Sequence, residues 1–332
     1  MPIPNQNNPS DILCQACNSS CNIVFSKISK YNAVKCKGCG LVQTLPAPSE
    51  GEIVDYYQNF QFQASDLRFI LTQIPDVAAS LKHLINSPLE NLSFLDYGGG
   101  CGIYSVAAKS LGMNVTLFDY DRSAIEFASQ ELGVDDACFR WEQVEGKKFD
   151  IIFAYHVVEH WREIDSNIAM LCSTLKDQGM LLFVTPNARS LEKWARPSHF
   201  LNYFKKWSRR GISFMNQVRL LIPTDSYFCW DPPRHLFAFT DESFEAIGKK
   251  YRFDTEIIIG YNVDKLYEPR SYVVPQASLW KALAYARRLK FREAWQIAFK
   301  AFSCIALKFL SFFFPQNGDQ LIVKFTKNKI LT

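Results

Sequence analysis

Long hydrophobic runs without charge are missing from this 332-residue sequence. The most apolar late stretch, residues 297–314, contains Lys300 and Lys308, whereas a membrane-spanning helix needs about 18 or more apolar residues with few charges. The first residues also lack the basic region and the apolar region of a secretory signal. We therefore expect no transmembrane helix and a cytoplasmic location.

A strong net charge is missing too. The formal charge is only +4, but the basic residues gather in two aromatic-rich segments, at about 191–229 and about 277–314. The first segment predicts either a lid over an anionic acceptor, such as a phosphorylated sugar, or a solvated basic surface. The second predicts amphipathic helices that either pack onto the sheet or lie peripherally on the anionic inner face of a membrane.

Cysteine, in contrast, is plentiful. Ten cysteines in a cytoplasmic protein predict metal ligands or buried thiols, because the cytosol keeps thiols reduced. Two C-x-x-C pairs flank an alternating segment that suits a small β-hairpin, and this spacing is typical of a zinc ribbon over residues 1–46. Four thiolates leave no open coordination position, so the zinc is expected to be structural. The expected ligands are Cys14, Cys17, Cys36 and Cys39.

The predicted ribbon has a modest basic face, formed by lysines such as Lys30, Lys35 and Lys37. A ribbon that grips nucleic acid would carry a denser one, so nucleic acid is not the expected partner. A proline-marked linker follows, and acidic residues after Ser49 suit the first turn of a helix. We therefore place a domain boundary near residue 46, with a second domain over 47–332.

Four glycines lie within five positions at 98–102, between two different patterns. Residues 92–97 predict a strand, residues 101–112 a helix ending at a glycine, and residues 114–121 a second strand. A glycine loop at the end of a first strand lets a ligand approach the backbone, and an acid about 20 positions later can bind ribose hydroxyls. The candidate cofactor-binding residues are Asp96, Gly98, Gly100, Gly102 and Asp119.

Two cofactors compete for this loop. A dinucleotide brings a pyrophosphate, which an acid at Asp96 would repel, whereas the same acid could hold the positive amino group of S-adenosylmethionine. With Asp96 at its head and Asp119 ending the second strand, the stretch resembles the first motif of class I S-adenosylmethionine-dependent methyltransferases. The resemblance implies that cofactor and a methyl-transfer activity.

The remaining pattern alternates strands and helices. Such alternation predicts a Rossmann-like α/β fold, with a seven-stranded, mostly parallel sheet and helices on both faces. Glu142, after the third strand, is a candidate for the adenine side or a solvated loop acid. The further expected strands are 137–141, 149–155, 180–187, 253–262 and 319–327, with a helix over 157–179.

The segment after the fourth strand reads His156-x-x-Glu159-His160. It resembles a subgroup that includes quinone-biosynthesis O-methyltransferases, whose members carry E-x-x-E-H here and in some cases bind a divalent metal. An imidazole replaces the first carboxylate, so a metal is chemically feasible but does not carry over directly. The same spacing occurs in inverted zinc proteases, which have another context. His156 is either a cofactor-side residue or a residue packed at a helix start.

The methyl acceptor is suggested by the absence of one motif and by the resemblance of residues 230–240. Enzymes that methylate amino groups of nucleic-acid bases usually have an N/D/S-P-P-aromatic motif after the fourth strand, and none is found there. Residues 230–240 instead resemble a P-R-H-L-x-x-F-T segment of zinc-ribbon methyltransferases in polysaccharide and secondary-metabolite pathways. The expected acceptor is an oxygen or carbon of a small molecule, such as a sugar or its lipid- or nucleotide-linked form. The alternatives are an RNA methyltransferase or a non-catalytic adenosylmethionine-binding protein.

Only five histidines are present, so few groups could remove a proton near neutral pH. We expect His235 to act as the base, with Arg234 holding a phosphate or a developing oxyanion and with His160 and Glu159 supporting the acceptor or a metal. The alternative is that His235 caps its loop and Arg234 pairs with Asp231.

Overall fold

The computed structural model describes residues 12–58, 67–190, 208, 229–260 and 317–327. Both predicted basic segments lie outside these ranges, apart from Ser208 and Cys229 at the first of them. The chain divides into two compact units, one of Met1–Pro186, Cys229–Ile258 and Leu321–Thr332, the other of Asn187–Phe228 and Ile259–Gln320. No helix among the described residues is long and apolar enough to cross a bilayer.

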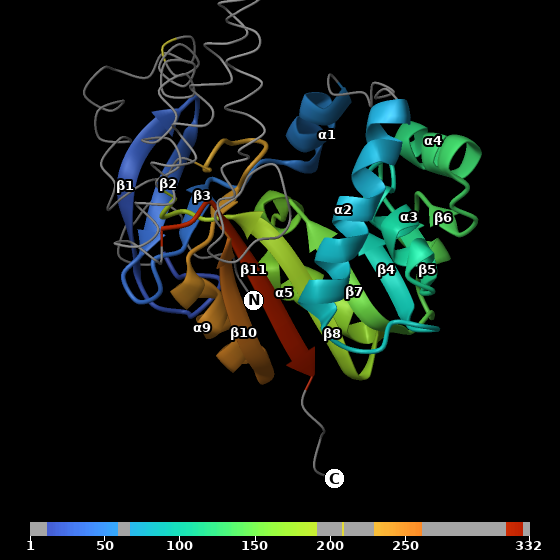
Figure 1. Ribbon diagram of the computed structural model, residues 1–332. Coiled ribbons are helices and arrows are strands. Elements are labelled where there is room, and N and C mark those ends of the chain that lie inside the picture. The colour runs from blue at the N-terminus through green and yellow to red at the C-terminus, as the bar shows by residue number, and fades with distance from the viewer. Residues whose placement is uncertain (1–11, 59–66, 191–207, 209–228, 261–316, 328–332) are drawn as a thin grey trace, which may run out of the picture. The chain divides into compact units, whose positions relative to one another are not determined.

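The central feature is a seven-stranded sheet (Figure 1), which confirms the expected fold class. The pairs β5–β6, β4–β5, β4–β7 and β7–β8 are all parallel, while β11 runs opposite to β8 (Figure 1). In spatial order the strands are β10 (Phe253–Gly260), β11 (Gln320–Lys327), β8 (Leu175–Pro186), β7 (Phe149–Tyr155), β4 (Ser93–Tyr97), β5 (Asn114–Phe118) and β6 (Ala137–Cys138).

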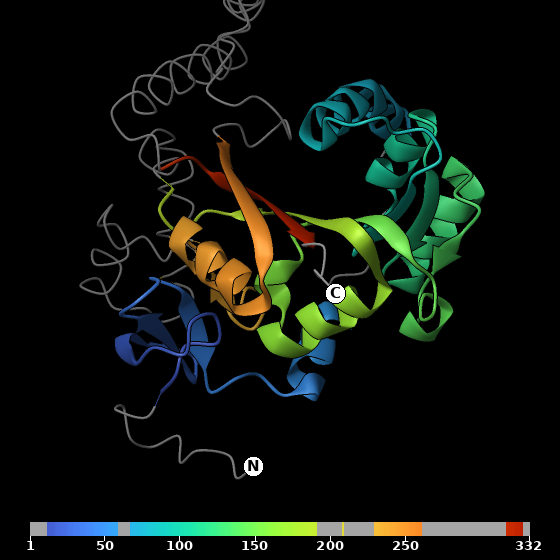
Figure 2. The same ribbon diagram turned by 90° about the horizontal axis from the view of Figure 1, so that it is seen from below.

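Helices lie on both faces of this sheet. Figure 2 shows α2 and α3 on one face and α5 and α9 on the other. The central strands are therefore buried on both sides, which is why β7 is almost continuously apolar. The helices are α1 (Glu50–Gln58), α2 (Leu67–Ile85), α3 (Ile103–Ser110), α4 (Arg122–Leu132), α5 (Ile164–Thr174) and α9 (Asp241–Tyr251).

A second, four-stranded sheet contains the predicted ribbon. The expected hairpin is formed by β1 (Cys21–Ile28) and β2 (Tyr31–Cys36), which pair antiparallel, and β3 (Val42–Leu45) pairs with β2. The fourth strand comes from far along the chain: β9 (Phe237–Ala238) pairs antiparallel with β3. The sequence analysis missed this addition, because a two-residue strand has no periodicity of its own.

The expected helix over 157–179 is wrong at both ends. The segment after β7 forms a 3-10 turn, η3 (Val158–His160), α5 begins only at Ile164, and β8 already begins at Leu175. The turn forms because the Glu159 side chain is buried and bonded to Thr185 on β8, which the regular α-helical pattern did not anticipate. His160 therefore lies in a turn and not on a helix. The third strand is also shorter than the predicted 137–141.

Candidate functional site

The glycine loop has a backbone that only glycine adopts readily. Gly98, Gly100 and Gly102 all have positive φ angles of 71°, 54° and 82°. A Cβ atom at Gly98 would lie 2.6 Å from Val157, so packing requires glycine there. At Gly100, a Cβ atom would meet nothing within 4 Å. The loop therefore presents bare backbone to open space at Gly100.

Asp96, at the end of β4, is almost completely buried, with 1% of its surface exposed. Its Oδ2 accepts a hydrogen bond from the Ser105 hydroxyl at 2.7 Å, but its Oδ1 has no partner within the described residues. Burial raises the pKa of Asp96 to about 7, although the Ser105 bond opposes the rise. A buried carboxylate oxygen without a donor suits a cationic ligand group, such as the amino group of S-adenosylmethionine.

Asp119 follows β5 and faces the same loop. Its Oδ2 accepts from the Gly100 N–H at 2.8 Å, and its Oδ1 accepts from the Asp121 N–H at 2.8 Å. Burial raises the pKa of Asp119, and these two N–H groups oppose the rise. Each carboxylate oxygen keeps a further lone pair for a ribose hydroxyl. Together with the open space at Gly100 and the unpaired oxygen of Asp96, this donor set fits S-adenosylmethionine.

Aromatic side chains flank Asp119, and the sequence analysis missed them. Tyr120 is 71% exposed, and its ring lies edge-on to the Phe118 ring with centroids 5.0 Å apart. The Trp141 ring also lies edge-on to Phe118, with centroids 5.4 Å apart. Glu142 is exposed next to Trp141. An exposed aromatic directly after a ribose-binding acid suits a flat base, which was a signal available in the sequence.

Around the turn after β7, His156 and Glu159 form a pair. His156 has a φ of 56°, and its Nδ1 lies 3.0 Å from Oε1 of Glu159. The other carboxylate oxygen accepts from the Thr185 hydroxyl at 3.0 Å. Burial is the largest single influence and acts to raise the pKa of Glu159, but the bond with His156 and the charges of His156, His160 and His235 together outweigh it, and the pKa falls to about 2. Glu159 is thus an ionised, fully buried carboxylate, and His156 supports it directly.

His160 and His235 lie against each other. Their rings meet edge to face with centroids 4.7 Å apart, although 75 positions separate them in the chain. Nδ1 of His160 lies 2.7 Å from the Tyr57 hydroxyl on α1, which is a further residue that the sequence analysis missed. Burial lowers the pKa of His160 to about 4 and also lowers the pKa of His235, so both imidazoles are neutral at pH 7.

The tautomer of His235 is fixed by its partner. Its Nδ1 lies 2.7 Å from the carbonyl oxygen of Cys229, which can only accept, so Nδ1 carries the proton. Nε2 then bears the lone pair, and within the described ranges this buried atom has no hydrogen-bond partner. Arg234, directly beside it, forms no ion pair with any carboxylate that the structure describes, Asp231 included. A neutral imidazole and a guanidinium are thus neighbours in this segment.

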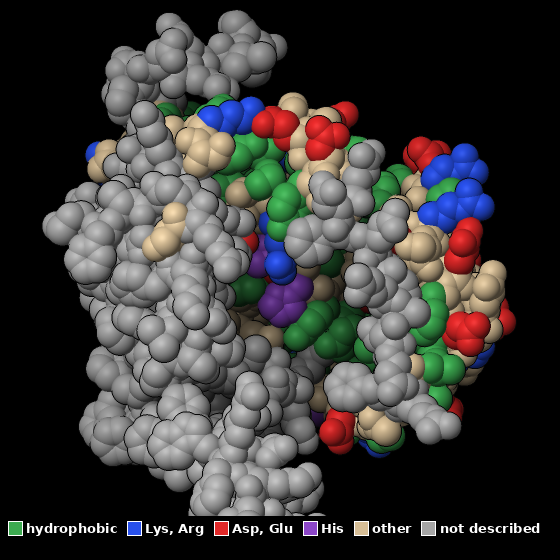
Figure 3. Space-filling model, turned by 90° about the horizontal axis from the view of Figure 1, so that it is seen from above, with side chains coloured by type: hydrophobic (Ala, Val, Ile, Leu, Met, Phe, Trp, Pro, Cys, Tyr) green, Lys and Arg blue, Asp and Glu red, His purple; other side chains and the backbone are tan. Residues whose placement is uncertain are grey.

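On the face shown in Figure 3, histidine side chains lie next to a basic side chain and among hydrophobic ones. Asp96 lies near the carboxyl end of β4, Gly100 and Asp119 follow β4 and β5, and Glu159 and His160 follow β7. His235 comes from a distant segment and joins this group through its contact with His160. Because neighbouring parallel strands end at the same edge of a sheet, these residues belong to one site region. The described part of the chain therefore brings together most of the residues that the sequence singled out.

Two groups of side chains could hold a metal ion. The ligand atoms of Cys14, Cys17, Cys36 and Cys39 all lie within 4.8 Å of one another. Two of the sulfur pairs are 3.6 and 3.3 Å apart, near the roughly 3.8 Å edge of a tetrahedral zinc–thiolate site. The N–H groups of Gly38 and Cys39 point at the sulfur of Cys36, as they do in a metal knuckle. This set fits zinc.

The second group is Glu159, His160 and His235, whose ligand atoms also lie within 4.8 Å of one another. Two imidazoles and a carboxylate form a donor set for a divalent cation. The sequence suggested Glu159 and His160 here, and the structure adds His235 from a distant segment.

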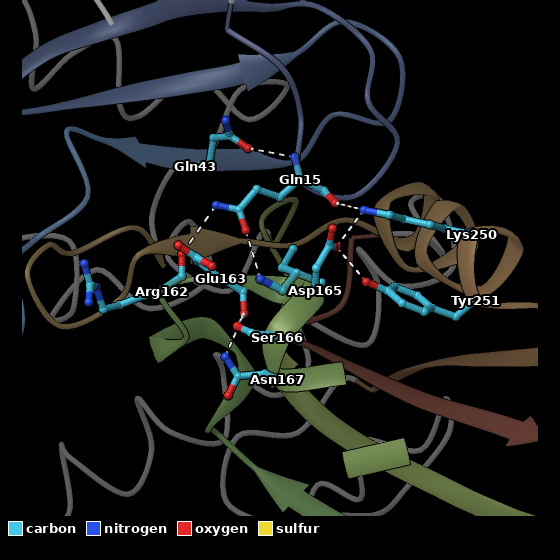
Figure 4. A network of polar contacts seen from close by, with 10 residues as sticks. Gln15, Gln43, Arg162, Glu163, Asp165, Ser166, Asn167, Lys250 and Tyr251 are labelled. Atoms are coloured by element: carbon cyan, nitrogen blue, oxygen red, sulfur yellow. Dashed lines mark hydrogen bonds and ion pairs between the residues drawn. The ribbon is translucent and has the colours of Figure 1, made fainter. Parts of the chain in front are cut away.

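The ribbon is bonded to the helices α5 and α9 through Gln15, which lies inside the first C-x-x-C pair (Figure 4). The side-chain oxygen of Gln15 accepts a hydrogen bond from the Ile164 N–H at the start of α5, at 2.9 Å. The backbone N–H of Gln15 donates to the side-chain oxygen of Gln43 on β3, at 3.2 Å. Lys250 on α9 donates to the Gln15 carbonyl oxygen at 3.0 Å and also pairs with Asp165. The cysteine knuckle is thereby tied to the helix that follows His160.

Comparisons with known proteins give a consistent family. A methyltransferase-domain family model matches residues 66–256, which is more than half of the chain. A ubiquinone biosynthesis O-methyltransferase of Bartonella quintana (strain Toulouse) is 32% identical over 131 residues, covering 37% of this chain and 53% of that protein. The corresponding protein of Pelagibacter ubique (strain HTCC1062) is 30% identical over 128 residues, with 37% and 53% covered. The chain spans about half the length of the curated relatives it matches.

Solved structures are more distant. Phosphoethanolamine N-methyltransferase 2 of Haemonchus contortus, in complex with S-adenosyl-L-methionine, matches with a TM-score of 0.44 and 16% identity, covering 82% of this chain and 58% of that one. A sarcosine dimethylglycine methyltransferase of Galdieria sulphuraria, so described in its solved structure, matches with a TM-score of 0.41 and 12% identity, covering 78% and 86%.

Proposed function

Because the chain belongs to the methyltransferase domain family, we propose that this protein is an enzyme that transfers a methyl group from S-adenosylmethionine to an oxygen or carbon of a small molecule. The matched residues 66–256 include the glycine loop, both candidate acids and the three histidines of the site. The matched relatives are O-methyltransferases, so oxygen is the favoured acceptor atom.

The cofactor side is proposed to hold S-adenosylmethionine through charge and bare backbone. Asp96 offers its unpaired oxygen to the amino group, Asp119 offers lone pairs to the ribose, and Gly100 leaves space against the loop. The sulfonium of the cofactor supplies an electrophilic methyl group. Further cofactor contacts are proposed from Gly98, Gly102, Glu142 and His156.

The acceptor side is proposed to remove a proton. The observation that carries this proposal is the Nδ1–H bond from His235 to Cys229, which leaves the Nε2 lone pair buried and without a partner among the described residues. A neutral imidazole near a hydroxyl can accept its proton as the oxygen attacks the methyl carbon. His160, 4.7 Å away between ring centroids, has no such fixed tautomer, so His235 is the preferred base.

Arg234 is proposed to bind the anionic part of the acceptor. It is half-buried beside His235 and has no carboxylate partner within the residues described. A guanidinium in such a place can stabilise a phosphate or a developing oxyanion. This favours a small acceptor with an acidic hydroxyl or a phosphate, of which a phosphorylated sugar and a phenol are two examples.

A divalent cation bound to Glu159, His160 and His235 is a second way to activate the acceptor oxygen, supported by the closeness of their ligand atoms. The two mechanisms predict different responses to a chelator. With a base alone, methyl transfer persists while the ribbon keeps its zinc. With a metal, transfer is lost and is restored by a divalent cation.

One experiment tests the proposed function. The purified protein is incubated with S-adenosylmethionine labelled in its methyl group and with cell extract separated into RNA, lipid, polysaccharide and small-molecule fractions. We expect label in the small-molecule fraction with the wild type, and none with Gly100→Val. Label in RNA would instead support docking of RNA by the ribbon, and binding of the cofactor without any transfer would support a non-catalytic protein.

The proposed location is the cytoplasm, with peripheral contact to a membrane through residues of about 277–314, which lie outside the described ranges. Flotation of the full-length protein with vesicles of anionic phospholipid at low salt tests this contact. Protein that stays at the bottom of the gradient would favour packing of this segment onto the protein.

A further inference from the structure

Thr44, on β3 of the ribbon, makes two hydrogen bonds to a segment far along the chain. Its Oγ1 donates to the carbonyl oxygen of Leu236 at 2.7 Å and accepts from Nε1 of Trp230 at 2.8 Å. Thr44 is 6% exposed and both partners are almost fully buried. A single hydroxyl therefore holds two points of the segment that carries Arg234 and His235.

These two points lie next to the ends of the bond that fixes the His235 tautomer. His235 directly precedes Leu236, and its acceptor Cys229 directly precedes Trp230. A shift of either partner of Thr44 would change the distance from His235 Nδ1 to the Cys229 carbonyl oxygen. The hydroxyl of a ribbon residue is thus bonded to the direct neighbours of both partners in the His235–Cys229 bond.

The other side of the same segment is held by the turn after β7. The Leu236 N–H donates to the carbonyl oxygen of Glu159 at 2.8 Å, while its own carbonyl oxygen is held by Thr44. The Leu236 backbone therefore links the ribbon strand to the turn that carries His160. Pairing of β9 with β3 continues this contact directly after Leu236.

The cysteine knuckle contributes one more bond. The Thr240 hydroxyl donates to the Cys39 carbonyl oxygen at 2.7 Å, just before α9. The segment from Trp230 to Thr240 is thus bonded to the ribbon at its start, in its middle and at its end. The ribbon acts as a scaffold for this segment.

We propose that Thr44 is a positioning residue for His235: its hydroxyl fixes the Trp230–Leu236 segment so that Nδ1 of His235 stays bonded to Cys229 and the Nε2 lone pair remains available to the acceptor. The catalytic meaning rests on the proposed function, whereas the effect on the imidazole does not. Valine has the shape of threonine without the hydroxyl, and serine keeps the hydroxyl, so Thr44→Val and Thr44→Ser form a matched pair.

The test observes the imidazole directly in the full-length protein as purified without chelator. Long-range proton–nitrogen spectra of protein labelled with ¹⁵N-histidine report the tautomer of each of the five histidines, and His235→Gln assigns the His235 signals. We expect the Nδ1–H form in the wild type and in Thr44→Ser. In Thr44→Val we expect at least half of the population to shift to the Nε2–H form, which free imidazole side chains prefer.

Zinc content and calorimetric binding of S-adenosylhomocysteine should be the same in all three proteins, since neither the cysteines nor the glycine loop contacts Thr44. An unchanged His235 tautomer in Thr44→Val overturns the proposal. If Thr44→Val does not fold, Trp230→Phe removes one of the two bonds and leaves the hydroxyl, and a wild-type tautomer in that variant also overturns it.

Methyl transfer separates this proposal from the proposed function. Using labelled S-adenosylmethionine and the small-molecule fraction as probe, we expect Thr44→Val to lower kcat by roughly tenfold or more with an unchanged KM for the cofactor, and Thr44→Ser to restore most of it. A changed tautomer in a protein whose wild type transfers no methyl group would leave the positioning role intact and refute the enzyme. Normal transfer with a changed tautomer would refute the role of His235 as base.

Discussion

The proposed cofactor side and the proposed acceptor side of the site are built in opposite ways. On the cofactor side, the bonds join near neighbours: Ser105 to Asp96 over 9 positions and Gly100 to Asp119 over 19. On the acceptor side, Tyr57 reaches His160 over 103 positions and Thr44 reaches Leu236 over 192. One side is a local motif, and the other is assembled by folding.

This difference teaches that the two sides should fail separately. The glycine loop depends on backbone angles within one strand–loop–helix unit and on the adjacent strand β5. The acceptor side depends on docking of the ribbon, through Gln15, Thr44 and the pairing of β3 with β9. Damage to the ribbon should therefore spare cofactor binding, while damage to the loop should spare the ribbon.

The largest expected effect is at the glycine loop. Gly100→Val should abolish binding of S-adenosylmethionine, because the valine side chain would occupy the space proposed for the cofactor. The φ of 54° at this position also strains any residue other than glycine. Gly133→Val is the matched control: it has a φ of 66° and equally open surroundings, but it caps α4. Calorimetry should show no binding for the first variant and near-normal affinity for the second. Equal affinities would remove Gly100 from the cofactor site.

The next effect concerns the ribbon and sharpens the comparison most. Cys14→Ser should lose the proposed zinc. The free energy of unfolding should fall by about 2–5 kcal/mol, because binding of a structural metal contributes directly to folding. Cofactor affinity should change by less than about threefold, whereas methyl transfer should fall steeply as the acceptor segment loosens. Metal analysis, thermal unfolding and calorimetry measure the three quantities, with Cys172→Ser, outside the ribbon, as control. Zinc absent from the wild type contradicts the prediction.

A smaller effect is expected at the ribose-binding acid. Asp119→Ala should weaken cofactor binding by about 2–3 kcal/mol, because charge-assisted hydrogen bonds to hydroxyls are lost. The zinc content and the tautomer of His235 should not change, since the Asp119 carboxylate is bonded to the N–H groups of Gly100 and Asp121 and to neither the ribbon nor the His235 segment among the described residues. Asp135→Ala, an exposed acid, is the control. Wild-type affinity in Asp119→Ala would refute the assignment.

The last effect is on the stability of the cofactor-free protein and depends on pH. The pKa of Asp96 is raised from 3.8 to about 7 in the folded protein, so the folded state holds a proton that the unfolded state releases between these values. Stability without cofactor is therefore undiminished below about pH 4, falls as the pH rises toward 7, and stays lowered above it.

Asp96→Asn should consequently raise the stability of the cofactor-free protein at pH 8 by roughly 2–4 kcal/mol, and should change it little at pH 4. The same variant should bind S-adenosylmethionine more weakly, because an uncharged amide cannot balance the positive charge of the cofactor's amino group. Urea unfolding at both pH values and calorimetry check the two effects. A variant less stable than wild type at pH 8 would show that the ionised carboxylate is satisfied in the fold.

Much of the cofactor side could be predicted from the sequence, for a physical reason. Positive φ angles require glycine, an acid ends each of two apolar strands, and both signals lie within 28 residues that are read together. The strands β4, β5 and β7 were predicted to within three residues at each end, because their buried faces give continuous apolar runs. The role of each residue at the cofactor stays a prediction.

The acceptor side was predicted only in part. His160, Glu159 and His235 were recognised as unusual residue types, but their closeness depends on contacts between distant segments. Tyr57 and Thr44 were missed because a tyrosine on a helix and a threonine on a strand fit the local pattern equally well without any further role. The helix expected over 157–179 was wrong because burial of Glu159 against Thr185 outweighs local helical preference.

By itself, the sequence determined the α/β class, the order of the strands along the chain, the four clustered cysteines and the loop whose glycines have no substitute. Only the tertiary structure decided that β9 joins the ribbon sheet, that His235 meets His160, and that its proton lies on Nδ1. The physical reason is range: backbone angles and apolar periodicity act between near neighbours, whereas a hydrogen bond such as Thr44 to Leu236 exists only once both sheets have formed.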